Sequence, residues 1–298
     1  MKRRTLLVAA LGLTGCSGRG PAVDRLTIAA GEPGGFYLEF AQLLAGQLVA
    51  SGVARETQVK STGGSADNLR LLAKGETDLA LSLADAVTAG PGVRAIGRVY
   101  ENYLQCVVRA DSSYKSLRDL GGATISAGAA GSGAALTASR LLVSAKVDAT
   151  TSHLPLAQAA DALASGSIDA MFWSGGVPTA TLDKLSKQTP IRLLPLDSSL
   201  GALRRTYGAV YQDVRVPTGV YGATAPVSVI GIPNLLLCRP ELSADVARGV
   251  AKTLSRQAVH LVPPSAVGAQ FLNLQSLVVT APIPLHDGAT EEYRRLYG

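Results

Sequence analysis

A short unit that occurs twice in the chain limits its fold more than any other feature. Residues 71–80 read LLAKGETDLA and residues 162–171 read ALASGSIDAM. In each, a helical stretch ends at a glycine, an aspartate follows three residues later, and a run typical of a buried strand begins. Glycine favours such a helix end because it adopts the left-handed conformation without strain. Each unit lies in its own series of alternating strands and helices, so the sequence predicts two α/β halves.

Two halves of this kind indicate two lobes that face each other across a cleft. The apolar stretches 103–109 and 227–237 are expected to cross between the lobes as a two-strand hinge. A helix at 244–261 is expected to pack back on lobe one. In open α/β sheets the ligand lies at the carboxyl ends of the strands. The expected division is a first lobe of residues 26–107 and 227–298 and a second lobe of residues 108–226.

Lobe one is expected to begin as a regular alternation of elements. The predicted strands are 26–30, 58–61 and 78–83, and the predicted helices are 38–48 and 68–73. Ser65 is expected to cap the second helix, because a serine hydroxyl accepts a hydrogen bond from a free N–H group of the first turn.

The N-terminus has the features of an export signal. Lys2, Arg3 and Arg4 precede a short apolar run at 6–13, which is far below the roughly 20 residues of a membrane-spanning helix. The run ends in LTGC at 13–16, which resembles the bacterial lipobox, so we expect a signal peptide over 1–15, lipidation of Cys16 and a lipid-anchored linker over 16–25. An ordinary signal peptide that contains a cysteine is the alternative.

Charge and cysteine content exclude some partners. Of the formal charge of +6, three units belong to the signal peptide, which leaves +3 on scattered residues. No basic run suits a phosphate backbone, so nucleic acid is not expected as a partner. Cys106 and Cys238 lie in apolar, strand-like runs. Two buried thiols are the expectation, with a disulfide between them left open.

Glycine-rich loops mark the expected binding site. They lie at 31–37, 62–65, 128–133 and 174–178, two in each lobe, where strands end and helices begin. The free N–H groups and the dipole of a helix N-terminus favour an anion. Four such loops facing one cleft indicate a shared site for an anionic group, although each loop alone is also an ordinary structural turn.

Motifs of enzymes are absent. The chain lacks the phosphate-binding GxxxxGK[ST] motif and a complete dinucleotide fingerprint. The SxxK match at 112–115 lacks its companion motifs. The three histidines are far apart, in no metal-ligand spacing. We therefore expect no catalytic residue, no cofactor and no metal site.

Taken together, the loops resemble those of the TAXI-type solute-binding proteins of tripartite ATP-independent periplasmic (TRAP) transporters. The resemblance runs from about residue 26 to 293. Its carriers are GEPGGFY at 31–37, GGSADNL at 63–69, GETDLA at 75–80, DLGG at 119–122, GSG at 131–133, GSIDAMF at 166–172, PTGVY at 217–221 and PLHDGA at 284–289.

The resemblance implies a class II periplasmic-binding fold that closes about a hinge and hands its ligand to a membrane permease. It also implies a ligand of the glutamate, related amino acid or dicarboxylate class, and an extracytoplasmic, monomeric, membrane-anchored protein at the periplasm or cell surface. A ligand-sensing subunit of a receptor such as a histidine kinase is the alternative. The ligand-binding residues carried over are Tyr37, Ser65 and Asn68 from lobe one, and Ser132, Gly133, Trp173, Gly176 and Tyr221 from lobe two.

Some of these residues have plain structural alternatives. Ser65 and Asn68 are also suited to a helix cap, and Trp173 is also suited to a core. Leu83 stands where the family commonly has a glutamine, and this loss of a polar group at the cleft edge implies a less polar ligand.

Overall fold

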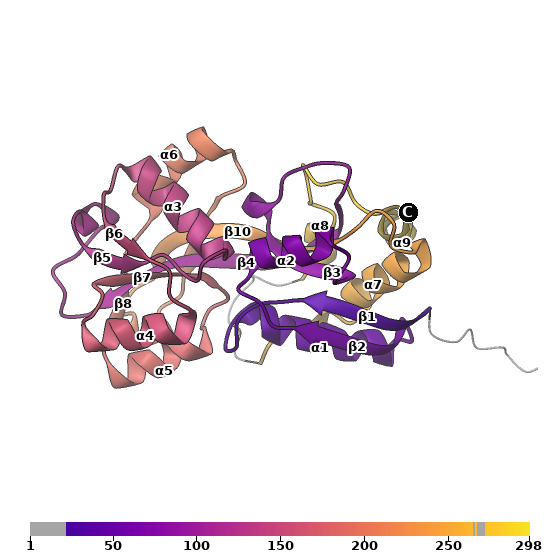
Figure 1. The fold of residues 1–298 in the computed structure, drawn as a ribbon, viewed down its shortest axis with the longest axis horizontal. Helices are drawn as coiled ribbons and strands as arrows, with labels where there is room; N and C mark the ends of the chain where they lie inside the picture. The colour runs from indigo at the N-terminus through magenta and orange to yellow at the C-terminus, as the bar shows by residue number, and fades with distance from the viewer. Residues whose placement is uncertain (1–21, 265, 267–271) are drawn as a thin grey trace, which may run out of the picture.

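The computed structural model describes residues 22–264, 266 and 272–298, so the predicted signal peptide and Cys16 lie outside the described residues. The described chain forms two α/β lobes along one mixed sheet, with strand order β2-β1-β3-β10-β4-β7-β5-β6 (Figure 1). Strand β8 pairs with β4, and β9 pairs with β10. The predicted α/β class with two lobes and a two-strand hinge is therefore correct.

Lobe one is formed by both ends of the described chain. Its elements are β1 (Val23–Ala29), α1 (Phe36–Ala50), β2 (Ala54–Lys60), α2 (Ser65–Ala73), β3 (Leu79–Leu83), α7 (Ala244–Arg256), α8 (Leu274–Leu277) and α9 (Asp287–Tyr297). Alternate residues of β1 face two cores, because successive side chains of a strand point to opposite faces. Leu26 and Ile28 pack with α1, whereas Ala29 packs with Leu72 of α2.

Lobe two is the middle of the chain. Its elements are β5 (Thr124–Ser126), α3 (Gly133–Ala145), β6 (Thr150–Ser152), α4 (Leu156–Ser165), β7 (Ala170–Gly175), α5 (Ala180–Gln188), β8 (Ile191–Leu193), α6 (Asp197–Tyr207) and β9 (Gln212–Val216). Helices α3 and α6 lie on one side of its strands, and α4 and α5 lie on the other (Figure 1).

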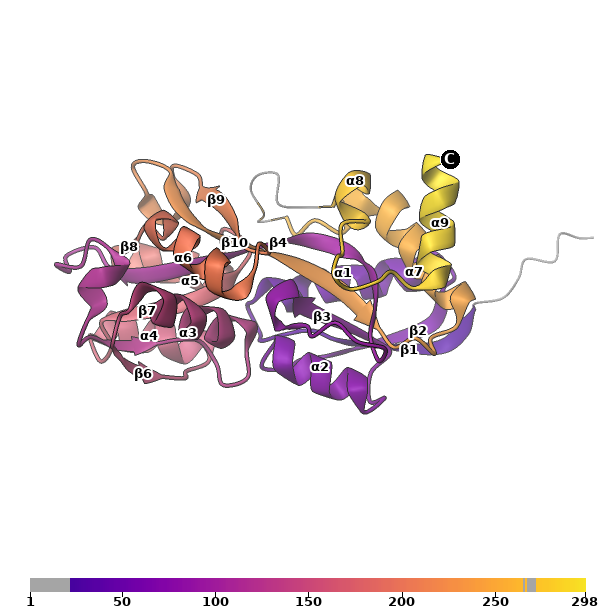
Figure 2. The same cartoon turned by 90° about the horizontal axis from the view of Figure 1, so that it is seen from above.

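Two long antiparallel strands join the lobes. These are β4 (Arg94–Arg109) and β10 (Val227–Cys238), which run side by side from one lobe to the other (Figure 2). They contain both predicted hinge crossings, and the expected boundary near residue 107 falls inside β4. One strand therefore belongs to both lobes. Cys106 and Cys238 lie in these strands as buried free thiols, which confirms the expectation for them.

The repeated unit is one structural device used once in each lobe. Gly75 and Gly166 follow the ends of α2 and α4 with φ of 73° and 78°, the left-handed region that favours glycine. Asp78 then accepts a hydrogen bond from the Thr27 N–H at 2.8 Å, and Asp169 accepts one from the Thr124 N–H at the same distance. Each carboxylate thus ties its strand to the first strand of its own lobe.

An arginine at the end of each hinge strand completes the device. Arg239, just after β10, donates to the carbonyl oxygens of Leu72 and Thr77 at 3.1 and 3.2 Å. Arg109, the last residue of β4, donates to the equivalent carbonyls of Leu163 and Ile168 at 3.0 and 3.2 Å. The repeat therefore sets how each hinge strand is attached to the lobe it enters.

Two local predictions are wrong. Gly64, not Ser65, is the N-cap of α2, because the Ser65 hydroxyl is turned toward β3 and accepts from the Leu83 N–H at 3.1 Å. The helix expected at 244–261 ends at Arg256 and is followed by a short turn at 258–260. It does pack on lobe one, against α1 and α9.

Candidate binding site between the lobes

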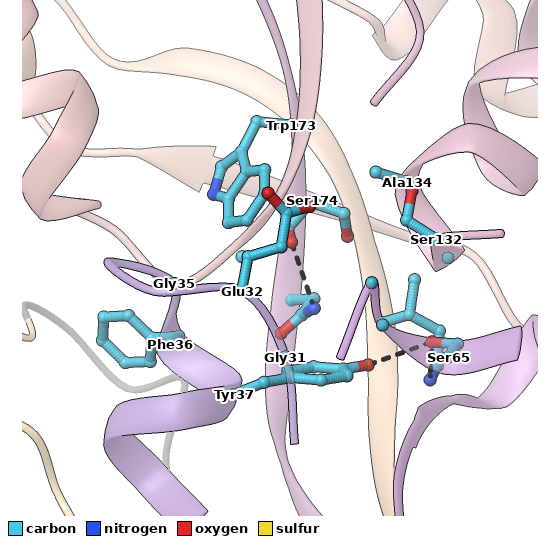
Figure 3. A pocket seen from close by; sticks show the side chains of 16 residues that line it. Gly31, Glu32, Gly35, Phe36, Tyr37, Ser65, Ser132, Ala134, Trp173 and Ser174 are labelled. Carbon is cyan, nitrogen blue, oxygen red and sulfur yellow. Dashed lines mark hydrogen bonds between the residues drawn. The ribbon is translucent and has the colours of Figure 1, made fainter. Parts of the chain in front are cut away.

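A pocket lies between the lobes, at the carboxyl ends of strands from both (Figure 3). Lobe one contributes the loop after β1, the first turn of α1, the start of α2 and the end of β3. Lobe two contributes the start of α3 and the end of β7, and the hinge contributes Asn102. The lining residues are Gly31, Glu32, Gly35, Phe36, Tyr37, Gly63, Gly64, Ser65, Leu83, Asn102, Ser132, Gly133, Ala134, Trp173, Ser174 and Gly175.

Three helix N-termini meet at this pocket. Helices α1, α2 and α3 all begin with residues that line it. In α3 the Ser132 hydroxyl accepts from the Ala135 N–H at 3.0 Å, and no described residue accepts from the N–H groups of Gly133 and Ala134. None of the lining residues is lysine, arginine or histidine. An anionic group would therefore be held by backbone N–H groups and helix dipoles.

Five of the eight residues carried over by resemblance line the pocket. These are Tyr37, Ser65, Ser132, Gly133 and Trp173. The Tyr37 hydroxyl lies 3.3 Å from the Ser65 hydroxyl (Figure 3). Burial raises the pKa of Tyr37, so its phenol stays protonated and remains a hydrogen-bond donor. The pocket wall thus has neutral hydroxyl groups on the lobe-one side.

The other three residues do not line the pocket, although they hold its walls in place. Asn68 is fully buried, and its side-chain amide donates to the carbonyls of Ala30 and Leu81 at 2.5 and 2.7 Å and accepts from the Thr62 hydroxyl at 2.6 Å. It therefore joins α2 to the ends of β1 and β3, and its hydrogen-bonding groups are occupied within lobe one.

Gly176 and Tyr221 act behind Trp173. The Trp173 indole N–H donates to the Thr179 hydroxyl at 3.0 Å, which donates to the Gly176 carbonyl at 2.8 Å. The Thr179 N–H in turn donates to the buried Tyr221 hydroxyl at 2.6 Å. Gly176 also lies against the Phe36 ring of lobe one. These residues therefore set the position of the indole from behind.

Sequence reasoning missed three polar residues of the pocket. Glu32 reaches across from lobe one, and its Oε2 accepts from the Leu156 N–H at the start of α4 at 2.8 Å. Asn102 is 1% exposed, and Ser174 has a buried hydroxyl. Glu32 lies in a loop that was recognised for its glycines. Asn102 and Ser174 lie in strand sequence that carries no motif, so no local signal marks them.

Direct contacts between the lobes show a closed arrangement. Besides the Glu32 bond, the Ala66 N–H at the start of α2 donates to the Gly131 carbonyl at 3.1 Å. At a third point Asp85, which follows β3, reaches lobe two and accepts from the hydroxyls of Thr137 and Tyr211 at 2.8 and 3.1 Å.

Asp85 also faces Arg140 of α3 at 3.5 Å, and its own side chain is fully buried. Burial raises the pKa of Asp85, while the hydrogen bond from Thr137 and the charge of Arg140 oppose that rise. The carboxylate therefore depends on lobe-two partners that only the closed arrangement supplies.

Two further features bear on the kind of site. Within the described part of the chain, no group of three or more His, Cys, Asp or Glu side chains is placed to hold a metal ion. The helices that the structure describes include none long and apolar enough to cross a membrane.

Comparison with known proteins places the chain in a family. The sequence model of the NMT1-like family matches residues 28–295. Among solved structures, one titled as a periplasmic transporter shares 12% identity and covers 92% of both chains, with a TM-score of 0.54. A Bordetella bronchiseptica RB50 protein shares 14% identity over 92% of this chain and 98% of its own, also with a TM-score of 0.54. A Xanthomonas citri protein bound to ATP shares 14% identity over 92% and 95%, with a TM-score of 0.50.

Proposed function

Because the chain belongs to the NMT1-like family, we propose that it is a solute-binding protein that closes its two lobes around a small carboxylate-bearing solute and delivers it to a membrane permease. The observation that carries this proposal is the pocket itself, which both lobes and the hinge line together. A ligand in this pocket contacts both lobes at once only when they are closed, and these contacts therefore favour the closed arrangement.

The chemistry of the walls supports a carboxylate. The N–H groups of Gly133 and Ala134 are donors at the cavity, and the hydroxyl pair of Tyr37 and Ser65 offers one more, because its other hydrogen lies in the bond between them. Closure removes water, which strengthens each hydrogen bond to an anionic group. Leu83, Phe36 and Trp173 supply apolar surface for the rest of the molecule. The TAXI subtype and a TRAP permease as the recipient are part of this proposal, as the sequence motifs imply.

Ligand binding is testable with the chain's only tryptophan, because Trp173 lines the pocket. The purified chain would be titrated with L-glutamate, L-glutamine, L-leucine, glutarate and succinate, while indole fluorescence and the melting temperature are recorded. One solute at 100 times its Kd is expected to stabilise the fold by about 2.7 kcal/mol. Tyr37→Phe, which removes one donor, should weaken that binding about tenfold. A folded protein that responds to none of these solutes would refute the carboxylate assignment.

The membrane attachment is a separate part of the proposal. We propose that Cys16 carries the lipid that keeps the protein extracytoplasmic and close to its permease. In cells given an alkyne-labelled fatty acid, the wild-type chain should take up label and sediment with membranes. Cys16→Ser should lose both properties, and a labelled Cys16→Ser chain would refute this assignment.

A further inference from the structure

Glu32 is the one charged side chain among the described residues that line the pocket. Its Oε2 accepts from the Leu156 N–H, the first N–H of α4, whose N-cap Pro155 supplies no side-chain hydrogen bond of its own. Its Oε1 accepts no hydrogen bond from a described residue. Burial raises the pKa of Glu32, and the bond from Leu156 opposes that rise. One carboxylate oxygen thus links the lobes and the other remains available.

Asn102 and Ser174 offer further unpaired groups at the same pocket. The Asn102 amide nitrogen lies 3.5 Å from the Ser174 carbonyl, to which it donates. Its oxygen Oδ1 and the Ser174 hydroxyl are buried without a partner among the described residues. An amide oxygen can only accept, and a buried acceptor left unpaired costs about 1–3 kcal/mol. Both atoms are closed to solvent in this arrangement, so an N–H donor of a solute reaches them, and offsets that cost, only when the neighbouring side chains move apart.

The Glu32 side chain and the donor groups lie on different sides of the cavity. In Figure 3 the Glu32 side chain reaches toward Trp173 and Ser174, whereas the Tyr37–Ser65 pair lies at the opposite end. Ser132 and Ala134, at the N-terminus of α3, lie to another side. The pocket is therefore polarised, with the Glu32 carboxylate on one side and the donor groups of Tyr37, Ser65 and α3 elsewhere.

The proposed function allows both dicarboxylates and amino acids as solutes, and the charge of the pocket distinguishes between these two classes. A dicarboxylate would bring two negative charges beside the Glu32 carboxylate, with no basic side chain in the lining to offset them. It would also leave Asn102 Oδ1 without a donor. A zwitterion with one carboxylate and one protonated amine is neutral overall, and its ammonium group supplies three N–H donors.

We infer that Glu32, with Asn102 and Ser174, recognises a protonated amine on the solute, so that the ligand is an α-amino acid and not a dicarboxylate. This inference rests on the proposed function and narrows its ligand class. Glu32 also accepts the hydrogen bond from the Leu156 N–H at the start of α4. The same residue therefore binds the amine of the solute and links the two lobes. Amine recognition and closure are thereby coupled through one carboxylate.

The test uses matched pairs of solutes that differ only in the amine. These are L-glutamate with glutarate, L-leucine with 4-methylpentanoate, and L-norvaline with pentanoate, measured by calorimetry on the purified chain. We expect the amino acid of at least one pair to bind at least about 100-fold more tightly than its partner, since a site built around buried acceptors rejects a solute without donors.

Two substitutions separate charge from helix capping. Glu32→Gln keeps an oxygen for the Leu156 N–H but removes the charge, and it should reduce the preference within the pair to about tenfold or less. Glu32→Ala removes both and should also weaken closure, read as a larger radius of gyration in scattering at saturating solute. Glu39→Gln is the matched control, because Glu39 lies in the first turn of α1 outside the pocket lining, and it should bind as wild type does.

The outcomes distinguish the inference from the function it rests on. Equal affinity within each pair, or a preference that Glu32→Gln leaves unchanged, would overturn the role of Glu32 while solute binding stands. Binding of no compound from any pair by a folded protein would overturn both.

Discussion

Gly176 of lobe two packs against the ring of Phe36, a lobe-one residue that also lines the pocket, and we expect closure of the lobes to depend on this contact. A methyl group built at Gly176 would lie 2.5–2.6 Å from three atoms of the Phe36 ring, and ordinary contacts begin at 3.4 Å. The ring is 2% exposed and packs against Tyr100 with centroids 6.1 Å apart, so it has little room to turn away. Gly176→Ala therefore acts as a wedge between lobe two and lobe one.

The geometry sets the size of the effect. Relief of the 2.5 Å contact requires the lobes to separate locally by about 0.9 Å, because packed interiors have no spare volume at such a contact. If the lobes stay closed, overpacking of this kind costs about 1–3 kcal/mol. That cost falls on the closed arrangement alone, so solute affinity should drop about 5- to 150-fold. The stability of each lobe by itself should change little.

Solute affinity and small-angle scattering together test this reasoning. Gly176→Ala should bind the best solute more weakly and should keep a larger radius of gyration at a concentration that closes the wild type. Gly46→Ala is the matched control, because a methyl group at Gly46 of α1 meets nothing within 4 Å. Wild-type affinity and a wild-type radius in Gly176→Ala would refute the role of this contact in closure.

Three other substitutions test separate parts of the structure. Burial raises the pKa of Glu101 from 4.5 to about 7, although the charge of Arg98 opposes this rise. The folded state therefore holds a proton that the unfolded state releases, so the free energy of unfolding should fall as pH rises from about 4.5 to 7. Glu101→Gln should flatten that fall in urea unfolding measured across this range, and an unchanged pH profile would contradict the assignment. Asp85→Asn should weaken solute binding at least tenfold by calorimetry, because Arg140 then loses its charged partner in the closed arrangement and nowhere else. Wild-type affinity in this variant would show that the contact does not support closure. Asn68→Ala removes three hydrogen bonds, two of them buried, and should lower the free energy of unfolding by about 2–4 kcal/mol. A loss of affinity with unchanged stability would instead make Asn68 a ligand-binding residue.

The sequence alone was sufficient for the two-lobe fold. Its repeated helix–glycine–aspartate–strand unit depends on local rules, namely the left-handed conformation at Gly75 and Gly166 and an aspartate three residues after each glycine. Apolar runs long enough to cross between the lobes then predicted β4 and β10. These features can be predicted from sequence because each depends on only a few consecutive residues.

The pocket could be predicted only in part, because only some of its residues lie in a local sequence pattern. Glycine-rich loops marked Tyr37, Ser65 and Gly133, since strand–loop–helix junctions have a local signature. Whether Tyr221 or Asn68 reaches the cavity depends instead on how each lobe packs, and the structure places both behind its walls.

Which polar groups of the pocket can select one class of solute over another is evident only from the tertiary structure. Glu32 and Leu156 lie 124 residues apart, and their hydrogen bond exists because two lobes meet. Asn102 and Ser174 come together through the antiparallel pairing of β4 with β7 and are polar groups in otherwise ordinary strands. A local sequence pattern indicates which helix or strand a residue belongs to. A buried, unpaired acceptor beside a pocket arises only where distant segments come into contact.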